Sequence, residues 1–182
     1  MDAPALITAL QSLVPGLRVD NAPARDRQTT VAIEPGDVLN AMQALRDGPA
    51  LRCALLAELT AVDFWPKEPR FELIYLLVSI EHRFRVRVKV RLPGTDPHVA
   101  TVTPVWPGAN WLEREVWDLF GIAFDDHPDP RRLLMPEDWE GFPLRKDYPV
   151  QIRMTPRTGE PLQVTQEEFR ANLQRDRLSR PQ

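Results

Sequence analysis

Three carboxylates and an arginine lie within six positions of the segment Trp111–Ile122, which otherwise consists mostly of large hydrophobic residues. The acids are Glu113, Glu115 and Asp118. Clustered carboxylates supply the acid and base of many hydrolases, and they also bind metal ions. The same residue types can cap a helix or form ion pairs with a neighbouring subunit. The cluster therefore has a catalytic and a structural interpretation.

Helical periodicity separates the three acids. Asn110 suits the N-cap of a helix, and Glu113 then falls at N3, where its carboxylate can accept a hydrogen bond from the N-cap backbone N–H. Gly121 suits the position just past the end of this helix. Glu113 and Glu115 lie about 200° apart around the axis, whereas Glu115 and Asp118 lie about 60° apart. The spacing predicts capping for Glu113 and leaves one carboxylate pair.

That pair, Glu115 and Asp118, has two interpretations. Arg114 precedes Asp118 by four residues, a spacing at which opposite charges pair on a helix, so the group can form an ion-pair network or a partner interface. The alternative is a small hydrolase that uses both carboxylates. Against it, the pair lacks a separated acid and base, and the sequence shows no evident substrate cleft.

A second charged group, Arg145, Lys146 and Asp147, lies between Pro143 and Pro149. An exposed ion pair contributes only about 0 to 1 kcal/mol to stability. In a desolvated interface, losing one partner of such a pair costs roughly 2 to 5 kcal/mol. The arrangement therefore favours a docked segment over a free one.

Other patterns for cofactor or metal binding are weak. The eight glycines are too scattered for a G-x-G-x-x-G or Walker loop. Cys53 is the only cysteine, so this chain cannot supply the roughly four thiolates of an iron–sulfur cluster. Residues 125–129, DDHPD, bring oxygen and imidazole groups together, but the glycine and glutamate of a calcium loop are missing. We interpret that stretch as a turn and expect no metal site.

Composition limits the classes of partner. There are 23 basic against 26 acidic residues, for a net charge of −3, which argues against a chain that neutralises nucleic-acid phosphates. The first residues carry an acid and no basic run, unlike a secretory or transit peptide, so we expect a cytoplasmic chain. The longest apolar run, Leu73–Val78, is far shorter than the roughly 18 residues of a membrane span. Membrane association is therefore expected only through a partner.

Hydrophobic periodicity predicts the elements that position these residues. The expected elements are helices over 5–13 and 35–47 and strands over 29–33, the second half of 51–64, 71–80 and 84–92. Residues 71–80 are nearly continuously apolar, as a strand covered on both faces should be. Residues 84–92 alternate and form a hairpin with 71–80 that turns near Glu81 and His82.

The alternating strand 84–92 carries cations along one face: Arg85, Arg87, Lys89 and Arg91. They can form a solvated or edge-protecting face whose charges discourage stray strand pairing. They can also form a surface for an acidic partner. The sequence leaves both interpretations open.

Proline accounts for 19 of the 182 residues, and the density is highest over 128–149. Each proline removes a backbone donor and fixes its own φ, so this part cannot continue as a helix or central strand. We therefore expect an α+β fold over 1–122, with a small, mostly antiparallel sheet and flanking helices. An extended proline-rich segment and C-terminal tail should follow over 123–182.

Three motifs in this order resemble one family. They are E-R-E-x-x-D-L-F-G-I over 113–122, H-P-D-x-R-R-x-L over 127–134, and E-G-x-P-L-R-K-D-Y-P over 140–149. The family is that of the thirty-kilodalton subunit, or C subunit, of respiratory complex I, the proton-translocating NADH:quinone oxidoreductase. The resemblance covers roughly residues 59–149. Phe142 departs from it, because the family usually has histidine there.

The resemblance implies a cofactor-free, noncatalytic α+β subunit of the peripheral arm. It would dock on the forty-nine-kilodalton D subunit, which contributes the quinone site and which we call the quinone-site subunit. FMN, iron–sulfur clusters and quinone would belong to partner subunits. The complex would lie at the cytoplasmic face of a bacterial inner membrane. Homologous subunits also occur in membrane-bound nickel–iron hydrogenases and in F420H2- or ferredoxin-linked complexes, which remain an alternative.

The motifs also assign expected roles to residues. The expected partner interface consists of Glu115, Asp118, His127, Arg131, Arg132, Arg145, Lys146 and Asp147. The expected structural positions are Asn110, Glu113, Arg114, Gly121, Pro128, Gly141 and Pro143. The proline-rich segment and tail would extend over the larger neighbouring subunit.

Overall fold

The computed structural model describes residues 3–14, 16–20, 26 and 28–149. The elements are α1 (Ala3–Leu13), β1 (Arg18–Val19), β2 (Thr29–Ile33), the 3-10 turn η1 (Pro35–Asp37), α2 (Val38–Asp47), β3 (Leu55–Asp63), β4 (Phe71–Ser79), β5 (Phe84–Leu92), β6 (His98–Ala100), α3 (Ala109–Phe120) and β7 (Ala123–Asp125). The expected helices and strands are all present, within a few residues of their predicted bounds. The second helix begins as a 3-10 turn with proline at its first position, where a missing backbone N–H is tolerated.

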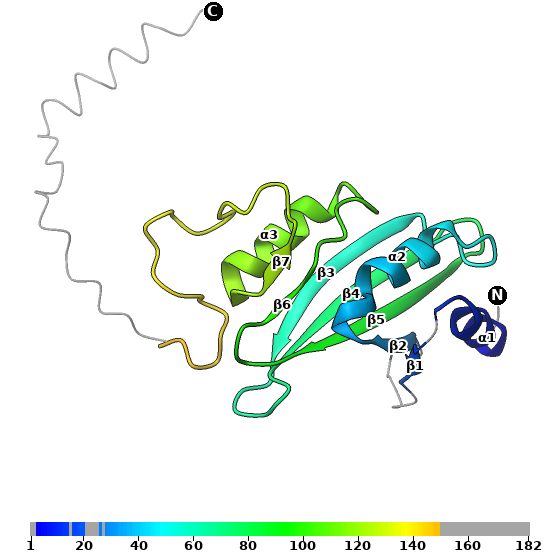
Figure 1. Ribbon diagram of the computed structural model, residues 1–182, viewed down its shortest axis with the longest axis horizontal. Helices are drawn as coiled ribbons and strands as arrows, with labels where there is room; N and C mark the ends of the chain where they lie inside the picture. Colours follow the sequence, from blue (N-terminus) through cyan, green and yellow to red (C-terminus); the bar gives the residue numbers. More distant parts are fainter. Residues whose placement is uncertain (1–2, 15, 21–25, 27, 150–182) are drawn as a thin grey trace, which may run out of the picture. The chain divides into compact units, whose positions relative to one another are not determined.

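One five-stranded sheet forms the centre of the fold, in the order β1-β2-β5-β4-β3 (Figure 1). The hairpin of β4 and β5 pairs Phe71 with Leu92 and Ser79 with Phe84. β3 is antiparallel to β4, β1 is antiparallel to β2, and only β2 and β5 are parallel. The expected α+β class with a mostly antiparallel sheet is confirmed.

The hydrophobic core lies on one face of this sheet. Phe71, Tyr75 and Leu77 of β4 point to this face and are fully buried. The amphipathic helix α2, which lies across the sheet in Figure 1, contributes buried Met42 and Leu45. Period-two burial in the strands and a hydrophobic stripe on the helix therefore produce one continuous core.

The opposite face of β4 is only partly covered by the described chain. Ile74, Leu76 and Val78 are half-buried, so the expectation that both faces of this strand are covered is wrong for this face. The near-continuous apolar pattern overstated the burial of the strand. Apolar side chains in a central strand do not require complete burial.

The cationic face of β5 forms ion pairs within the chain. Arg87 pairs with Asp26, and Lys89 pairs with Asp20 at 3.2 Å and with Glu72 at 3.4 Å. Because β5 lies between β2 and β4, its charges do not protect a sheet edge. The interpretation as an edge-protecting face is therefore wrong, and much of this charge is neutralised by Glu72 of β4 and by Asp20 and Asp26.

Two short elements escaped the sequence patterns. β6 and β7 form a separate two-stranded parallel sheet, with His98 opposite Ala123. They precede and follow α3 in the sequence, and α3 lies beside β3 (Figure 1). β6, α3 and β7 together therefore form a small layer against the main sheet. Three-residue strands carry too little alternation to be recognised from sequence.

Residues 127–148, which we call the strap segment, are irregular, as their prolines require. They do not lead away from the fold. Leu144 N–H donates to the Leu119 carbonyl at 3.0 Å, and the compact unit extends over Met1–Tyr148. The boundary of the compact unit therefore lies near residue 148 rather than at 122, and residues 150–182, most of the expected tail, lie outside the described residues.

Candidate functional site

Helix α3 carries two fully buried acids. Glu113 and Asp118 both have an exposed fraction of 0%, while Glu115, on the same helix, is half-buried. A buried carboxylate is stable only when its oxygens receive hydrogen bonds or a cation. The hydrogen-bond partners of each acid therefore show which segment of the chain it attaches to α3.

Glu113 fastens α3 to the turn that follows β6. Its carboxylate accepts hydrogen bonds from Thr101 Oγ1 at 2.5 Å and from the Val102 backbone N–H at 2.7 Å. The predicted capping role is wrong, because the helix begins one residue earlier than Asn110, its N-cap is Gly108, and no side chain caps it. Glu113 therefore lies on the second turn of the helix and faces the core.

Burial raises the pKa of Glu113 to about 7, and the hydrogen bonds from Thr101 and Val102 oppose part of that rise. His127 Nε2 lies 3.7 Å from the Glu113 carboxylate, and the His127 side chain is itself buried. These two groups, with Arg114 and Trp117, line a pocket of about 100 Å³. That volume is well below the roughly 300 to 1,000 Å³ typical of ligand pockets.

Glu113→Gln is expected to remove a pH dependence of stability. In the folded chain the pKa lies above its usual 4.5, so the stability that the protonated form contributes relative to the unfolded chain is fully present below pH 4.5 and is lost as pH rises towards 7. The wild-type free energy of unfolding should fall by roughly 3 kcal/mol over this interval. Chemical unfolding at a series of pH values measures how the free energy of unfolding changes with pH, and the control Glu115→Gln should behave as the wild type does. If Glu113→Gln showed the same fall with pH as the wild type, the role assigned to Glu113 would be contradicted.

Asp118 fastens α3 to the strap segment. Its Oδ2 accepts the backbone N–H groups of residues 133–135 at distances from 2.7 to 3.0 Å, and its Oδ1 accepts a bond from Arg132 at 2.7 Å. Burial alone would raise the pKa of Asp118, but the Met135 N–H, Arg132 and the other two N–H groups lower it overall. With all its oxygens occupied, Asp118 cannot form an exposed catalytic pair with Glu115.

Arg114 adds a second attachment of the strap segment. It donates to the backbone carbonyls of Arg131 and Arg132, both at 3.0 Å, and it pairs with Asp129 at 3.3 Å. The expected pairing of Arg114 with Asp118 is therefore replaced by two separate attachments to residues 129–135. A guanidinium group suits this role because its planar donors can serve several acceptors at once.

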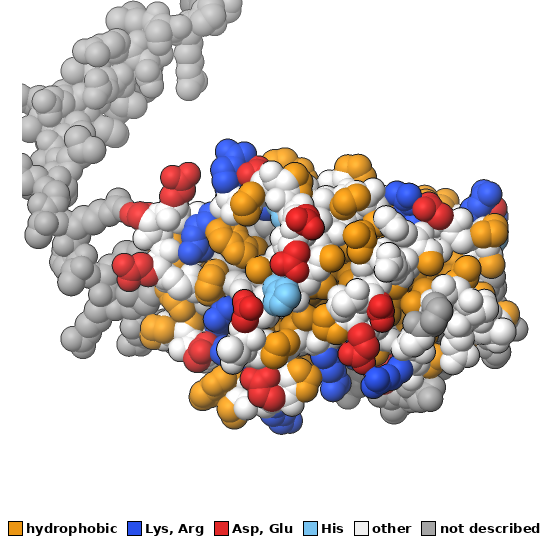
Figure 2. Space-filling view, in the orientation of Figure 1, with side chains coloured by type: hydrophobic (Ala, Val, Ile, Leu, Met, Phe, Trp, Pro, Cys, Tyr) orange, Lys and Arg blue, Asp and Glu red, His pale blue; other side chains and the backbone are white. Residues whose placement is uncertain are grey.

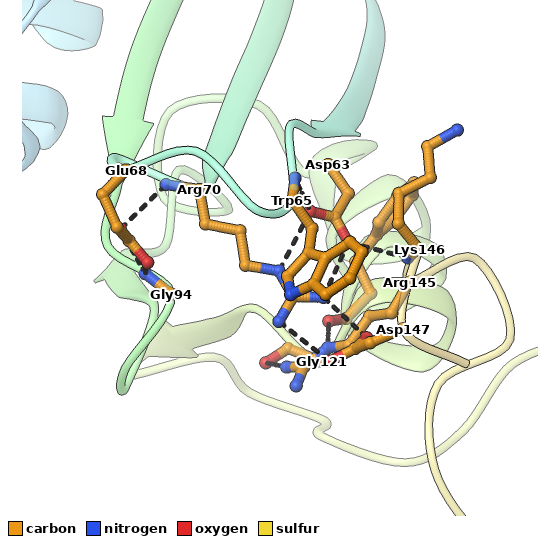
Figure 3. A network of polar contacts seen from close by, with 10 residues as sticks. Asp63, Trp65, Glu68, Arg70, Gly94, Gly121, Arg145, Lys146 and Asp147 are labelled. Atoms are coloured by element: carbon orange, nitrogen blue, oxygen red, sulfur yellow. Dashed lines mark hydrogen bonds and ion pairs between the residues drawn. The ribbon is translucent and has the colours of Figure 1, made fainter. Parts of the chain in front are cut away.

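Arg70 connects the β3–β4 loop, residues 64–70, to the end of the strap segment (Figure 3). It pairs with Asp63 at 2.8 Å and with Asp147 at 2.7 Å. The side chains of Arg70 and Asp63 are 10% and 1% exposed, whereas that of Asp147 is 45% exposed. The inner pair is therefore the energetically important one, since solvent screens the outer one.

Arg145 is held inside the fold. It donates to the Phe120 carbonyl at 2.5 Å and to the Gly121 carbonyl at 3.2 Å, and it stacks over the Phe142 ring at 4.5 Å. Burial, the largest effect, and Arg70 lower its pKa from the usual value. Phe142, which replaces the usual family histidine, packs between Arg145 and Arg132 by cation–π contact.

Gly121 explains how these groups approach the helix end. It ends α3 with φ +70°, as predicted for a residue just past the helix. A Cβ at this position would lie 2.4 Å from the Phe142 ring and 2.6 Å from Arg145 Nη2. Glycine therefore serves both the turn and the packing of the strap segment.

The remaining expected interface residues differ in accessibility. Arg131 is exposed and pairs with Asp129 at 2.7 Å. Glu115 and Lys146 form no side-chain ion pair or hydrogen bond with any described residue, and Lys146 is exposed. Of the expected structural positions, Pro128 and Gly141 are exposed, and Pro143 is half-buried. The structure thus brings most motif charges together inside the chain and leaves Lys146 facing outward.

Sequence reasoning missed Asp63, Arg70 and Thr101. They lie far from the strap segment or the helix in sequence, and none belongs to a recognisable local motif. Among the described residues there is also no cluster of three or more metal-ligating side chains, and no helix is long and apolar enough to span a membrane. The arrangement found is a set of buried ion pairs that fix an irregular segment against a helix and a loop.

Comparison with known families gives a match over residues 31–153 to the model described as the 30 kDa subunit of respiratory-chain NADH dehydrogenase. The chain is 43% identical over 150 residues to a C subunit of NADH-quinone oxidoreductase from Rhizobium meliloti, covering 82% of this chain and 81% of that protein. It is 42% identical to the corresponding C subunit of Roseiflexus castenholzii, with coverage of 82% and 86%.

Solved structures show the same fold. A trypsin-resistant fragment of Nqo5 aligns with a TM-score of 0.56 and 27% identity, over 71% of this chain and 99% of the fragment. A chain of a membrane-bound sulfane sulfur reductase, described as an archaeal respiratory membrane complex, aligns with a TM-score of 0.68 and 25% identity, over 81% and 85%. The similarity to respiratory complexes therefore extends to the tertiary structure.

Proposed function

The chain belongs to the family of the 30 kDa subunit of respiratory-chain NADH dehydrogenase, and from this membership we propose that it is a structural subunit of a proton-translocating NADH:quinone oxidoreductase. In this role it docks on the quinone-site subunit of the peripheral arm and positions it. The activity of the complex is that of the whole assembly, and the isolated chain is not catalytic. The complex binds the cytoplasmic face of a bacterial inner membrane.

The fastening of the strap segment is the observation that supports a structural role. Asp118 and Arg114 of α3 bond to the first half of the strap segment, and Arg70 of the β3–β4 loop pairs with Asp147 near its end. These bonds fix residues 127–148 in one conformation. A segment with so little regular structure loses much conformational entropy on ordering. Fixing it beforehand lowers the entropic cost of binding, as expected for a preorganised docking surface.

The redox groups belong, under this proposal, to other subunits. We expect FMN, the iron–sulfur clusters and the quinone in partner chains. The single cysteine, Cys53, is buried, and burial raises its thiol pKa to about 12. A thiol that resists ionisation is poorly suited to bind a metal. This argues against Cys53 as a metal ligand.

A related respiratory complex is the second candidate. A chain of an archaeal sulfane sulfur reductase has the same fold, which supports a role as the corresponding subunit of a different complex. Such a complex could be a nickel–iron hydrogenase or an F420H2- or ferredoxin-linked complex. A hydrolase is disfavoured because the oxygens of Asp118 are bound within the fold. The identity of the neighbouring subunits distinguishes the two complexes.

Native co-purification tests the proposed function. Gently solubilised membranes should yield an affinity-tagged full-length chain together with the quinone-site subunit and the cluster-bearing subunits, identified by mass spectrometry. Because docking is the proposed role, recovery of the chain alone under conditions that keep the complex active would overturn it. Recovery with hydrogenase subunits would instead support the second candidate.

A further inference from the structure

The β3–β4 loop and the strap segment each expose hydrophobic side chains. Phe64 is 42% exposed, Trp65 52% and Leu144 49%, and they are three of the seven large hydrophobic residues exposed on the described chain. Tryptophan buries a large apolar area when it binds a partner, and it is enriched at protein interfaces. With Lys146, we call these residues the loop surface.

A single carboxylate joins the two halves of the loop surface. The Asp63 side chain accepts the Trp65 backbone N–H at 2.9 Å and the Lys146 backbone N–H at 2.8 Å. Arg70 holds the same carboxylate from inside the fold. The backbones of Trp65 and Lys146 are therefore neighbours on a rigid support, although they are far apart in sequence.

The acids around this surface are already bound. Asp63 and Asp147 pair with Arg70, and Glu68 accepts the backbone N–H groups of Arg70 and Gly94. Lys146 has no side-chain partner among the described residues, and its side chain leads away from the network in Figure 3. Within the described part of the chain, the loop surface thus presents two separate groups, the unpaired Lys146 ammonium and the exposed Trp65 indole, whose backbones are held by the same carboxylate.

Many charges elsewhere are paired within the chain. On the face drawn in Figure 2, acidic and basic side chains are interspersed, often next to each other, and on β5 Arg87, Lys89 and Arg91 pair with acids, whereas Arg85 forms no ion pair with a described residue. A lysine without a partner among the described residues, whose backbone is held near that of an exposed tryptophan, fits a partner that supplies a carboxylate and an apolar side chain. Such complementarity sets specificity and register in protein interfaces.

We propose that the loop surface docks an acidic segment of a partner subunit, which places a carboxylate against Lys146 and an apolar side chain against Trp65. The proposal rests on the proposed function, because it names the surface and the partner chemistry through which this subunit assembles. The buried Arg70–Asp63 pair is the support of that surface, and Trp65 is its apolar anchor.

Charge reversal in the full complex tests the proposal. Lys146→Glu and, separately, Trp65→Ser are expected to lower recovery of the partner subunits, relative to the tagged chain, at least about tenfold at physiological salt. Arg85→Glu makes the same charge change at an exposed arginine of β5 and should leave recovery unchanged. Wild-type recovery should fall as salt rises, because exposed charges are screened.

An aromatic photo-reactive amino acid in place of Trp65, which keeps an apolar ring at the anchor position, provides a second readout that does not depend on assembly being lost. It should cross-link to a partner-subunit peptide that contains aspartate or glutamate. Cross-linking to phospholipid alone, or to a peptide without acidic residues, would overturn the proposal. Full recovery of partners by Lys146→Glu would overturn it while the proposed function stands. Failure of the wild-type chain to recover partners would overturn both.

Discussion

Asp118→Ala is expected to reduce the free energy of unfolding of the chain by about 3 to 5 kcal/mol. The substitution leaves the backbone N–H groups of residues 133–135 and the guanidinium of Arg132 without their common acceptor. Removing one partner of a buried charge pair costs about this much, because the other groups stay desolvated and unbonded. Urea or thermal unfolding of the purified full-length chain measures the loss.

The same change should release the strap segment. Trypsin is expected to cleave Asp118→Ala after Arg131 or Arg132 under native conditions much faster than it cleaves the wild type, because opening this segment no longer breaks the bonds to Asp118. Glu115→Ala is the matched control, since its carboxylate makes no bond to a described residue. It should change stability by no more than about 0.5 kcal/mol. Equal effects at both positions would contradict the assigned role of Asp118.

Arg70→Met has the second large expected effect. It keeps much of the side-chain volume but leaves Asp63, 1% exposed, without its cation. We expect a loss of about 3 to 5 kcal/mol in the free energy of unfolding, with weaker attachment of Lys146 and Asp147. Arg91→Met is the control, because Arg91 is 67% exposed and pairs with Glu72 at 3.3 Å. It should cost at most about 1 kcal/mol.

Acid titration distinguishes loss of this pair from general damage. Burial acts to raise the pKa of Asp63, but Arg70 and the backbone N–H groups of Lys146 and Trp65 outweigh it and lower the pKa to about 2. Its contribution is therefore fully present above the unfolded value of 3.8 and is lost as pH falls through the folded value, by about 2 kcal/mol in the wild type. Arg70→Met should show a smaller loss over this interval. If Arg70→Met lost as much unfolding free energy as the wild type between pH 3.8 and about 2, the stabilising role assigned to the Asp63–Arg70 pair would be contradicted.

Local patterns predicted the elements because their physical causes are local. The alternation in 84–92 reproduces the bounds of β5, and Gly121 ends α3 because only a residue that tolerates positive φ suits that position. The three-residue strands β6 and β7 were missed because so few residues carry no periodic signal. They pair with each other although α3 separates them in the sequence, and no local pattern contains such a pairing.

Prediction of the site failed where the partner of a charge lies far along the chain. Glu113 matched a capping box in sequence, yet its carboxylate bonds to Thr101 and Val102. Arg145 was expected at an interface, yet it bonds the carbonyl of Phe120 at the helix end. Residue type and spacing indicate that a charge needs a partner, but they do not identify that partner.

The sequence by itself determined the α+β class, the hairpin, the helix of the acidic motif and the resemblance to one family, because these depend on periodicity, turn residues and motif spacing. Only the tertiary structure decided that Asp118 and Arg70 fasten the strap segment, and that Lys146 and Trp65 are exposed while their backbones bond to the same carboxylate. The physical reason is desolvation: the fold removes water from some charges and leaves others exposed. Whether a charge braces the fold or is available to a partner therefore depends on burial, which is a property of the whole chain.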